Sequence, residues 1–352
     1  MKAMVYYGNQ DVRFENIPEP KLKKTELKIK VDYCGICATD IEEYQYGPNF
    51  ISHKKPNKLT GKKLPLITGH EITGTIVETF NNQNSEIIGQ KVVLFGTITC
   101  EKCSYCRSGM TNQCSDMATV GFCQNGGFAE YLSWPIKNTL PIPKNLNSEI
   151  AAFTEPTSVA HHAVIKSNPI PGDIVSVIGA GTIGIIIIQI LKSMNMKVIS
   201  VDKDKDKLNF AKKMGADWIL ESNKEISKKI KKITNGKGCD IAIDCAGAPS
   251  TPKLCVESVK TSGKVIVVAI YKKEFNFDFN SIVSREIEIV GSLGYNKIDV
   301  ESAIELLSSN SVKVEEMISG IIQLEQMIDV GFKKMMNPKK DVYRILVSPS
   351  TK

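Results

Sequence analysis

The stretch Ile174-Val175-Ser176-Val177-Ile178-Gly179-Ala180-Gly181-Thr182-Ile183-Gly184 decides the fold of the second half of this chain. Its first five residues are mostly β-branched and predict a buried strand, and the uncharged run after it continues to Leu191 and predicts an apolar helix. The glycines between them follow the pattern Gly-x-Gly-x-x-Gly. This pattern is weak alone, but a strand before it and a helix after it indicate a dinucleotide-binding turn.

The same uncharged run has to be weighed as a membrane span. It contains three glycines, begins with a β-branched segment and lacks flanking aromatic residues. Strand, turn and helix therefore explain it better than a transmembrane helix.

An acidic residue follows the glycine pattern at the distance that a dinucleotide site requires. Asp202 ends the next strand-like run, and a carboxylate there can accept hydrogen bonds from the adenosine ribose. It would also repel a 2′-phosphate, which favours NAD over NADP, although Lys203, Lys205 and Lys207 weaken that preference. A turn that binds no nucleotide remains the alternative.

From residue 173 onward, strand-like and helical patterns alternate, which predicts a doubly wound parallel sheet. The expected strands are Ile174–Ile178, Val198–Val201, Trp218–Leu220, Ile241–Asp244, Val265–Ile270 and Glu286–Val290. Residues 1 to about 35 instead alternate as antiparallel strands do. The last sixty or so residues contain a helical pattern around 300–307 and a β-rich run at 342–347. We expect this tail to pack on the first domain and to make it discontinuous.

The strongest local motif is a group of four cysteines in one short polar loop. Four thiolates at this spacing can fill all positions around one tetrahedral zinc ion, which is typical of a structural site. Unrelated buried thiols are a poor alternative because the intervening residues are too polar for a core. The four are Cys100, Cys103, Cys106 and Cys114.

A second group of possible metal ligands is dispersed along the chain. His70 and Glu71 stand between glycines, and His70 alone is either a core histidine or a ligand. Glu155 lies in an apolar, helix-prone segment, where a buried carboxylate needs a metal or cation as partner. A solvent-facing position at a helix end is equally compatible with Glu155. Cys34 and Cys37 have the spacing of a redox pair, but no thioredoxin-like pattern surrounds them.

Length and composition limit the class of protein. The 352 residues are enough for two domains, and 42% hydrophobic with 24% charged residues is ordinary for a globular protein. The net charge of +7 could suit nucleic acid, but the cations are almost all lysine, and four arginines leave few groups for reading bases or phosphates. No signal peptide is indicated, and ten cysteines in a cytoplasmic chain suggest metal binding and buried thiols.

Taken together, these motifs resemble the zinc-dependent medium-chain alcohol and polyol dehydrogenases over essentially the whole chain. Within them, several short segments look most like 2,3-butanediol dehydrogenases. The segments are Glu43-Tyr44, Gly47-Pro48-x-Phe50, Leu59-Thr60-Gly61-x-x-Leu64-Pro65, Gly69-His70-Glu71, Gly331-Phe332 and Ile345-Leu346-Val347-Ser348-Pro349.

The resemblance implies a GroES-like, mostly β catalytic domain at 1–155 and 292–352, and a Rossmann domain at 156–291, with the active site in the cleft between them. It also implies two zinc ions in each chain. The catalytic zinc would be held by Cys37, His70 and Glu155, with Glu71 beside it, coordinating directly or through water. The structural zinc would be held by the four-cysteine loop.

The remaining implied roles concern proton transfer and the cofactor. Thr39 matches the hydroxyl that begins the proton relay, and Lys207 matches a side chain that reaches the adenosine ribose. Many relatives have a histidine five residues after the catalytic cysteine, and here that position is Glu42. A carboxylate can relay protons if its pKa is raised. The dinucleotide-binding residues are Gly179, Gly181, Thr182, Ile183, Gly184, Asp202 and Lys207.

The function implied is NAD-linked oxidation of a secondary alcohol or vicinal diol, of the 2,3-butanediol to acetoin type, by hydride transfer from an alkoxide held on zinc. The alternative within enzymes is a sorbitol, polyol or aldose dehydrogenase. Relatives are usually dimers or tetramers, so a cytoplasmic homo-oligomer is expected.

Two other classes compete with this hypothesis. A nucleic-acid-binding protein stabilised by the four-cysteine zinc would explain the charge, but it leaves Cys37, His70, Glu155 and the glycine turn unexplained. A non-catalytic dinucleotide-binding relative would hold one zinc ion in each chain instead of two. We expect neither nucleic acid nor membrane as a partner.

Overall fold

The computed structural model describes residues 1–337 and 342–350, and it divides into two compact units. The first contains Met1–Glu155, Asn296–Ser308 and the chain from Val314 onward. The second contains Pro156–Tyr295 and Ser309–Lys313, so it extends past the expected boundary at 291 and includes a short later segment. Two hydrogen bonds attach this later segment to the second unit. The Gln189 side chain donates to the Lys313 carbonyl at 3.1 Å and accepts from the Lys313 N–H at 2.8 Å.

The first unit is built mainly from antiparallel strands, as the alternating N-terminal pattern predicts. A three-stranded sheet has the order β2-β1-β4, and a seven-stranded sheet has the order β10-β6-β5-β3-β18-β17, with β9 also paired to β3. The strands of the first sheet are β1 Lys2–Gly8, β2 Asp11–Asn16 and β4 Leu66–Ile67. Those of the second are β3 Glu26–Gly35, β5 Glu71–Thr79, β6 Lys91–Leu94, β9 Tyr131–Pro135, β10 Thr139–Pro141, β17 Ile318–Gln323 and β18 Arg344–Ser348. Strands β7 Thr97–Ile98 and β8 Ala118–Thr119 form a separate pair.

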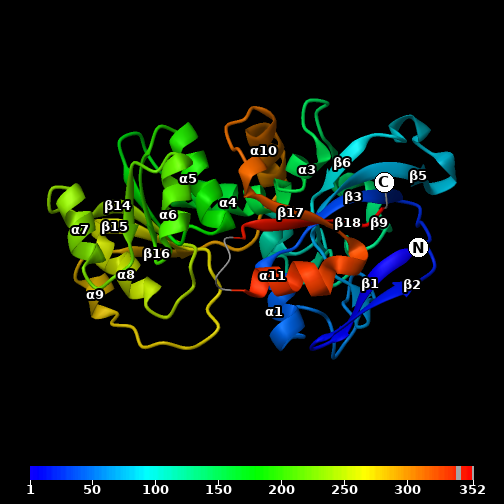
Figure 1. Ribbon diagram of the computed structural model, residues 1–352, viewed down its shortest axis with the longest axis horizontal. Coiled ribbons are helices and arrows are strands. Elements are labelled where there is room, and N and C mark those ends of the chain that lie inside the picture. The colour runs from blue at the N-terminus through cyan, green and yellow to red at the C-terminus, as the bar shows by residue number, and fades with distance from the viewer. Residues whose placement is uncertain (338–341, 351–352) are drawn as a thin grey trace. The chain divides into compact units, whose positions relative to one another are not determined.

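The C-terminal β-rich run joins the first unit as a strand. Strand β18 pairs antiparallel with β3 and parallel with β17, so residues more than 300 positions apart in sequence lie side by side (Figure 1). The buried side chains of both strands contribute to one core, which includes Ile29, Val31, Ile345 and Val347. The helices of this unit are α1 Ala38–Tyr46, α2 Ser104–Arg107, α3 Ser148–Ala151, α10 Lys297–Ser308 and α11 Lys333–Met336, with a π-helical turn at Met327–Phe332.

The second unit is a parallel sheet between helices, as the alternating pattern predicts. Its six strands have the order β13-β12-β11-β14-β15-β16, with helices α5 and α6 on one side and α8 on the other (Figure 1). The strands are β11 Ile174–Ile178, β12 Lys197–Asp202, β13 Trp218–Glu221, β14 Cys239–Asp244, β15 Val259–Val267 and β16 Glu288–Gly291. The helices are α4 Thr154–Ser167, α5 Thr182–Ser193, α6 Lys205–Lys213, α7 Ile226–Ile233, α8 Thr251–Ser258 and α9 Asn280–Val283.

The structure corrects the bounds of one expected strand and excludes the membrane-span reading of one uncharged run. The fifth strand was expected at 265–270 but runs from Val259 to Val267, because its polar first half, with a left-handed bend at Ser262, conceals it in the sequence. The uncharged run from Ile174 is strand β11, a turn and helix α5, and no helix in the described ranges is long and apolar enough to span a bilayer. The predictions of strand, turn and helix for this run are therefore confirmed.

Candidate functional site

One cysteine, one histidine and one glutamate from three separate elements meet in the first unit. Cys37 is the residue that caps helix α1, His70 lies in the turn between β4 and β5, and Glu71 is the first residue of β5. Their ligand atoms all lie within 4.8 Å of one another. Among the described residues, the carboxylates of Glu155 and Glu42 are not members of this group.

The turn that presents His70 depends on the glycine before it. Gly69 has φ +92°, in the left-handed region that favours glycine. A Cβ at this position would also lie 2.7 Å from Cys34 Sγ and 3.0 Å from the Phe128 ring. Cys34 is therefore a buried packing residue under the turn, which agrees with the expectation that its spacing to Cys37 is not a redox motif.

Two of the three residues are buried, and several of their polar atoms lack hydrogen-bond partners. His70 is 7% exposed and Glu71 is 1% exposed. In the described part of the chain, His70 Nδ1, both carboxylate oxygens of Glu71 and Asp40 Oδ1 have no hydrogen-bond partner. Buried polar atoms without partners are costly, so a set of them around one point is what a cation site requires.

Asp40, in the first turn of α1, contacts both Cys37 and His70. Its Oδ2 accepts a hydrogen bond from the Cys37 backbone N–H at 2.9 Å, and its Oδ1 lies 3.7 Å from His70 Nδ1. Burial opposes protonation of His70, but the Asp40 carboxylate and the Cys37 sulfur outweigh it and raise the pKa of His70. An acidic residue beside a ligand imidazole fixes the orientation of the ring and increases its basicity.

Glu71 faces a buried arginine as well as the ligand group. Arg344 Nε lies 3.1 Å from Glu71 Oε2, without hydrogen-bond geometry, and Arg344 Nη1 donates to the Ile36 carbonyl at 2.8 Å. Burial raises the pKa of Glu71, while Arg344 and then His70 act to lower it. The carboxylate of Glu71 is therefore held against the buried guanidinium of Arg344.

The other expected catalytic residues lie outside this group. The Cys37 thiol donates to Thr39 Oγ1 at 3.7 Å. Glu155, near the start of α4, is partly exposed, yet burial raises its pKa to about 7, with His70 acting in the opposite direction. Glu42 is partly exposed on α1.

Aromatic rings cover one side of His70. The Phe122 ring lies 4.9 Å from the His70 ring, and the Phe50 ring lies 6.3 Å from that of Phe122. Phe50 is 49% exposed. The site thus has an apolar wall that leads from the histidine to the surface of the unit.

The four cysteines of the polar loop also converge. The sulfurs of Cys100, Cys103, Cys106 and Cys114 lie within 4.8 Å of one another, and Cys103 caps the short helix α2. Backbone N–H groups hold the pKa of Cys103 down to about 6, whereas burial and the neighbouring thiols raise that of Cys106 to about 12. Four thiols in this arrangement cannot all ionise without a cation among them, so the group fits zinc.

The glycine pattern of the second unit forms the predicted turn between β11 and α5. Gly179 has φ +101°, and a Cβ at Gly184 would lie 1.9 Å from the Gly179 carbonyl oxygen, so the helix packs tightly on the turn. Gly181 caps α5, and a Cβ there would meet no atom within 4 Å. That open position, next to Thr182 and Ile183, leaves room for a phosphate group to approach the helix N-terminus.

Asp202 lies at the end of β12, directly beside this turn. One of its carboxylate oxygens accepts from the Ala180 N–H at 2.7 Å and the other from the Asp204 N–H at 3.0 Å. Lys207 is in the first turn of α6, and its N–H donates to Asp204 Oδ1 at 3.3 Å. Fold and hydrogen bonds thus bring the acidic residue and the glycine turn together.

Sequence reasoning missed Asp40, Phe122 and Arg344 as parts of the site. Arg344 carries a visible signal, because it is one of four arginines and lies in an otherwise apolar strand. Asp40, at the third position of a helix capped by a candidate ligand, has a weaker one. For Phe122 the sequence carries no signal, since its contact with His70 joins two distant loops.

The residues present fit two metal ions of the zinc type. The first group offers a thiol, an imidazole and a carboxylate, which are the donors that zinc takes, and among the described residues its buried nitrogen and oxygen atoms on His70 and Glu71 make no hydrogen bond. The second group offers four thiols and no other donor. Mixed donors are common at catalytic zinc sites, and four thiolates are typical of structural ones.

Comparisons with known proteins agree with both units. Residues 23–144 match the family described as "Alcohol dehydrogenase GroES-like domain", and residues 182–309 match "Zinc-binding dehydrogenase". The chain is 30% identical to (R,R)-butanediol dehydrogenase of Neisseria gonorrhoeae, over 99% of this chain and 100% of that protein. It is 32% identical to a sorbitol dehydrogenase of Halalkalibacterium halodurans, over 91% of this chain and 92% of that protein.

Solved structures extend the comparison to the fold. The crystal structure of 2R,3R-butanediol dehydrogenase from Bacillus subtilis matches with a TM-score of 0.92 and 30% identity, covering 99% of both chains. The likeness extends over the whole chain and is not confined to one unit.

Proposed function

The chain belongs to the family of zinc-dependent medium-chain alcohol and polyol dehydrogenases, and from that premise we propose that it oxidises a vicinal diol of the 2,3-butanediol type to the hydroxyketone. The observation that carries the proposal is the convergence of Cys37, His70 and Glu71 at the end of an apolar wall, where His70 Nδ1 and both Glu71 oxygens make no hydrogen bond among the described residues. The fold class and the membership in an oxidoreductase family, expected from the sequence, are confirmed.

We assign the catalytic zinc to Cys37 and His70, with Glu155 as third ligand and Glu71 adjacent. When bound, zinc supplies a Lewis acid that lowers the pKa of the substrate hydroxyl, and the nicotinamide cofactor accepts the hydride. The protein residues would orient the ligands and exclude water. Asp40 faces the His70 ring as an acidic partner and Phe122 covers one side of that ring. We assign to Thr39 the role of receiving the proton of the substrate hydroxyl.

The carboxylate of Asp202 supports NAD as the preferred cofactor. It stands beside the glycine turn, where it can accept hydrogen bonds from the adenosine ribose and repel a 2′-phosphate. We assign dinucleotide binding to the second unit through Gly179, Gly181, Thr182, Ile183, Gly184, Asp202 and Lys207.

We propose further that the protein is a homodimer or tetramer that pairs through strand β16. This strand is the last in its sheet order, and edge strands present backbone groups to a partner. Ile289, on the strand itself, is a large apolar side chain that is 44% exposed. Light scattering of the wild type and of Ile289→Lys, which places a charge on the strand, tests this. A monomeric wild type would remove the proposal.

A cytoplasmic location is proposed from the cysteines. None of the ten cysteines in the described ranges forms a disulfide, and a four-thiolate zinc site needs a reducing compartment. Cell fractionation followed by detection of the protein tests this.

The deciding experiment is a substrate panel followed by NADH or NADPH absorbance. It contains the stereoisomers of 2,3-butanediol, acetoin in the reverse direction, sorbitol, xylitol and glucose, each with NAD and with NADP. We expect a butanediol isomer with NAD to give the highest kcat/KM. Much faster turnover of sorbitol or glucose would instead identify a polyol or aldose dehydrogenase, the alternative that Glu42 in place of a relay histidine keeps open.

A further inference from the structure

Glu43 is a buried carboxylate near the end of helix α1, and none of the roles assigned above belongs to it. It is 1% exposed and lies in the last turn of the helix. A negative charge is unfavourable at this end of a helix, where the carbonyl groups are left without intrahelical partners. A carboxylate that is buried there needs hydrogen-bond donors close to it.

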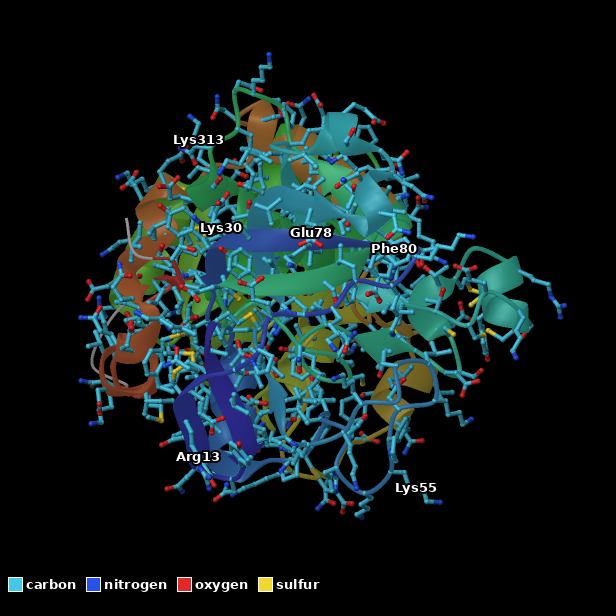
Figure 2. The ribbon with its side chains drawn as sticks, turned by 90° about the vertical axis from the view of Figure 1, so that its right-hand side faces the viewer. Arg13, Lys30, Lys55, Glu78, Phe80 and Lys313 are labelled. Carbon is cyan, nitrogen blue, oxygen red and sulfur yellow. The ribbon has the colours of Figure 1, made fainter. Side chains whose placement is uncertain are left out.

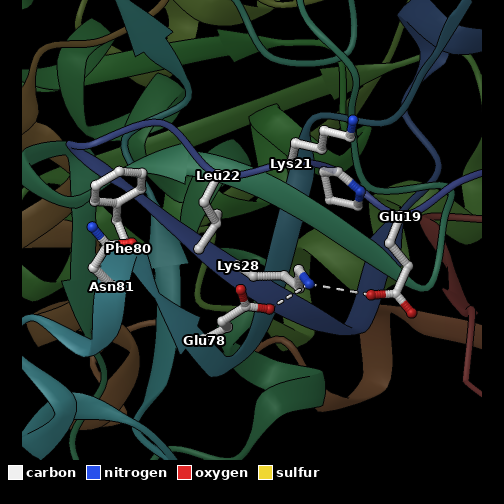
Figure 3. Close-up of a pocket in the computed structure, with 8 residues that line it drawn as sticks. Glu19, Lys21, Leu22, Lys28, Glu78, Phe80 and Asn81 are labelled. Atoms are coloured by element: carbon white, nitrogen blue, oxygen red, sulfur yellow. Dashed lines mark hydrogen bonds and ion pairs between the residues drawn. The ribbon is translucent and has the colours of Figure 1, made fainter.

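Two other carboxylates of the first unit lie at the surface and pair with lysine. Figure 2 shows Glu78 on the outer face of this unit. Figure 3 shows Glu78 and Glu19 on either side of Lys28, beside a surface depression, and Lys28 Nζ lies 3.2 Å from Glu19 Oε2. The carboxylate of Glu43 has partners of a different kind, namely backbone N–H groups.

The chain that follows α1 folds back onto the Glu43 carboxylate. The Asn49 N–H donates to both carboxylate oxygens, at 3.1 and 2.9 Å, and the Phe50 N–H donates to Oε1 at 2.6 Å. Hydrogen bonds to an ionised carboxylate are short and about twice as strong as those between neutral groups. These bonds therefore compensate the buried charge and fix the backbone of Asn49 and Phe50.

Two neighbours hold Glu43 in this conformation. A Cβ at Gly47 would lie 2.5 Å from Glu43 Oε2, so a glycine is needed where the carboxylate folds over the end of the helix. The Tyr6 hydroxyl donates to the Glu43 carbonyl at 2.8 Å. Burial, and then Glu43, raise the pKa of Tyr6 to about 12, so the phenol remains a donor near neutral pH. The arrangement is therefore built into the first unit.

The segment that this carboxylate fixes forms the outer end of the apolar wall. The Phe50 ring lies 6.3 Å from the Phe122 ring, which lies 4.9 Å from the His70 ring. Ile51, the next residue, is 1% exposed and belongs to the same core cluster as Phe122. The Ser52 N–H donates to the Phe122 carbonyl at 3.3 Å. A continuous set of contacts thus connects the end of α1 with the ligand group.

We infer that Glu43 is a positioning residue for substrate selection, because by fixing Phe50 beside Phe122 it limits the size of the molecule that reaches His70. For its substrates the inference rests on the proposed function. Glu43 takes no part in hydride or proton transfer, and the Phe50 ring acts by occupying space. The wall accordingly favours a short vicinal diol over a longer one, since one methylene group in an apolar site changes kcat/KM by about tenfold or more.

The test compares 2,3-butanediol with 3,4-hexanediol, which has one more methylene group at each end. Glu43→Gln keeps the size of the side chain but replaces one acceptor oxygen by a donor, so the following segment is released. Phe50→Ala removes the ring without altering Glu43. Each variant should lower the ratio of kcat/KM for butanediol to kcat/KM for hexanediol by about tenfold. For butanediol, KM should change more than kcat.

The matched control is Glu26→Gln. Glu26 is 8% exposed in the same unit, and its carboxylate also accepts a backbone hydrogen bond, from the Lys23 N–H at 3.1 Å. This variant should keep the ratio. Adding Glu43→Gln to Phe50→Ala should cause no further fall, because both changes act through one ring. A purely structural role of Glu43 predicts lower stability with an unchanged ratio, and that result would overturn the inference.

Binding of a chelator separates this inference from the proposed function. 1,10-Phenanthroline is a rigid aromatic ligand of zinc, and its association with the zinc-loaded protein is followed by absorbance without any oxidation. Glu43→Gln and Phe50→Ala should raise its association rate by about tenfold over the wild type and Glu26→Gln. If butanediol is oxidised but neither variant changes the rate or the ratio, the inference is wrong and the proposed function stands. If the rate rises in both variants but no alcohol is oxidised with NAD or NADP, the inference stands and the proposed function fails.

Discussion

The two groups of metal-ligating residues in the first unit differ in origin, in donor type and in burial. Cys100, Cys103, Cys106 and Cys114 come from one short loop, offer one kind of donor and are mostly half-buried. Cys37, His70 and Glu71 come from a helix cap, a turn and a strand, offer three kinds of donor and centre on two buried residues. Both groups are compact, since each keeps its ligand atoms within 4.8 Å.

The difference teaches what each group can do. Four thiolates fill a tetrahedron and leave no position for a substrate, so that site can only hold structure together. Three mixed donors leave a position free, and their surroundings of Asp40, Arg344 and Phe122 set charge and access. A site that does chemistry thus needs the fold around it, whereas a structural site needs little beyond its own loop.

The largest expected effect comes from the mixed group. His70→Ala should reduce kcat/KM by about 10⁴-fold, because it removes several kcal/mol of Lewis-acid stabilisation with the zinc. The zinc content should fall from two ions in each chain to one, while the thermal midpoint changes little. A variant that keeps two zinc ions and measurable activity would show that His70 is a core residue. The distinction between a structural and a catalytic metal group would then be wrong.

Next in size is the loss of the structural site. Cys103→Ser should lower the free energy of unfolding by about 4 kcal/mol, since removal of a structural metal is among the most destabilising single changes. Cys123→Ser, a half-buried cysteine outside both groups, serves as the matched control. Denaturant unfolding with zinc analysis measures both. Equal stabilities for the two variants would mean that the four-cysteine loop is not a folding element.

A smaller effect, on zinc affinity, distinguishes the roles of Glu155 and Glu71 in the mixed group. Glu155→Gln should weaken catalytic zinc binding by about 100-fold and Glu71→Gln by about tenfold, the range seen when groups around a metal are changed. The reason is that Arg344 already balances the charge of Glu71, whereas burial raises the pKa of Glu155 to about 7, so its anionic form requires a cation. Competition with a chromophoric chelator measures both affinities. The reverse order would assign the direct ligand to Glu71.

The smallest effect concerns proton transfer at the same group. Glu42→Gln should slow alcohol oxidation by about tenfold and shift its pH profile, because a relay carboxylate would be lost while the metal ligands remain. Steady-state rates between pH 6 and 10 measure this, with zinc content as the control. An unchanged profile would remove Glu42 from the mechanism.

How much the sequence predicted depends on how local each feature is. The four-cysteine loop and the glycine turn were predicted correctly as motifs, because their residues are neighbours in the chain and their spacing carries the geometry. The late start of β15 was hidden, since the polar residues before Lys264 do not look like a strand. The pairing of His70 with Asp40 could not be read from the sequence, because a turn and a helix bring them together.

Composition and spacing alone thus determined the Rossmann unit and the four-thiolate loop, while the ligand set around His70 came from the resemblance to a known family. The unit and the loop follow from periodicity, glycine geometry and donor type, which act over a few residues. Tertiary structure alone decided that Cys37, His70 and Glu71 meet, that Arg344 returns on the last strand to face Glu71, and that Phe122 lies beside His70. Those contacts join segments far apart in the chain, and only the packing of β3, β5 and β18 in one sheet brings them together.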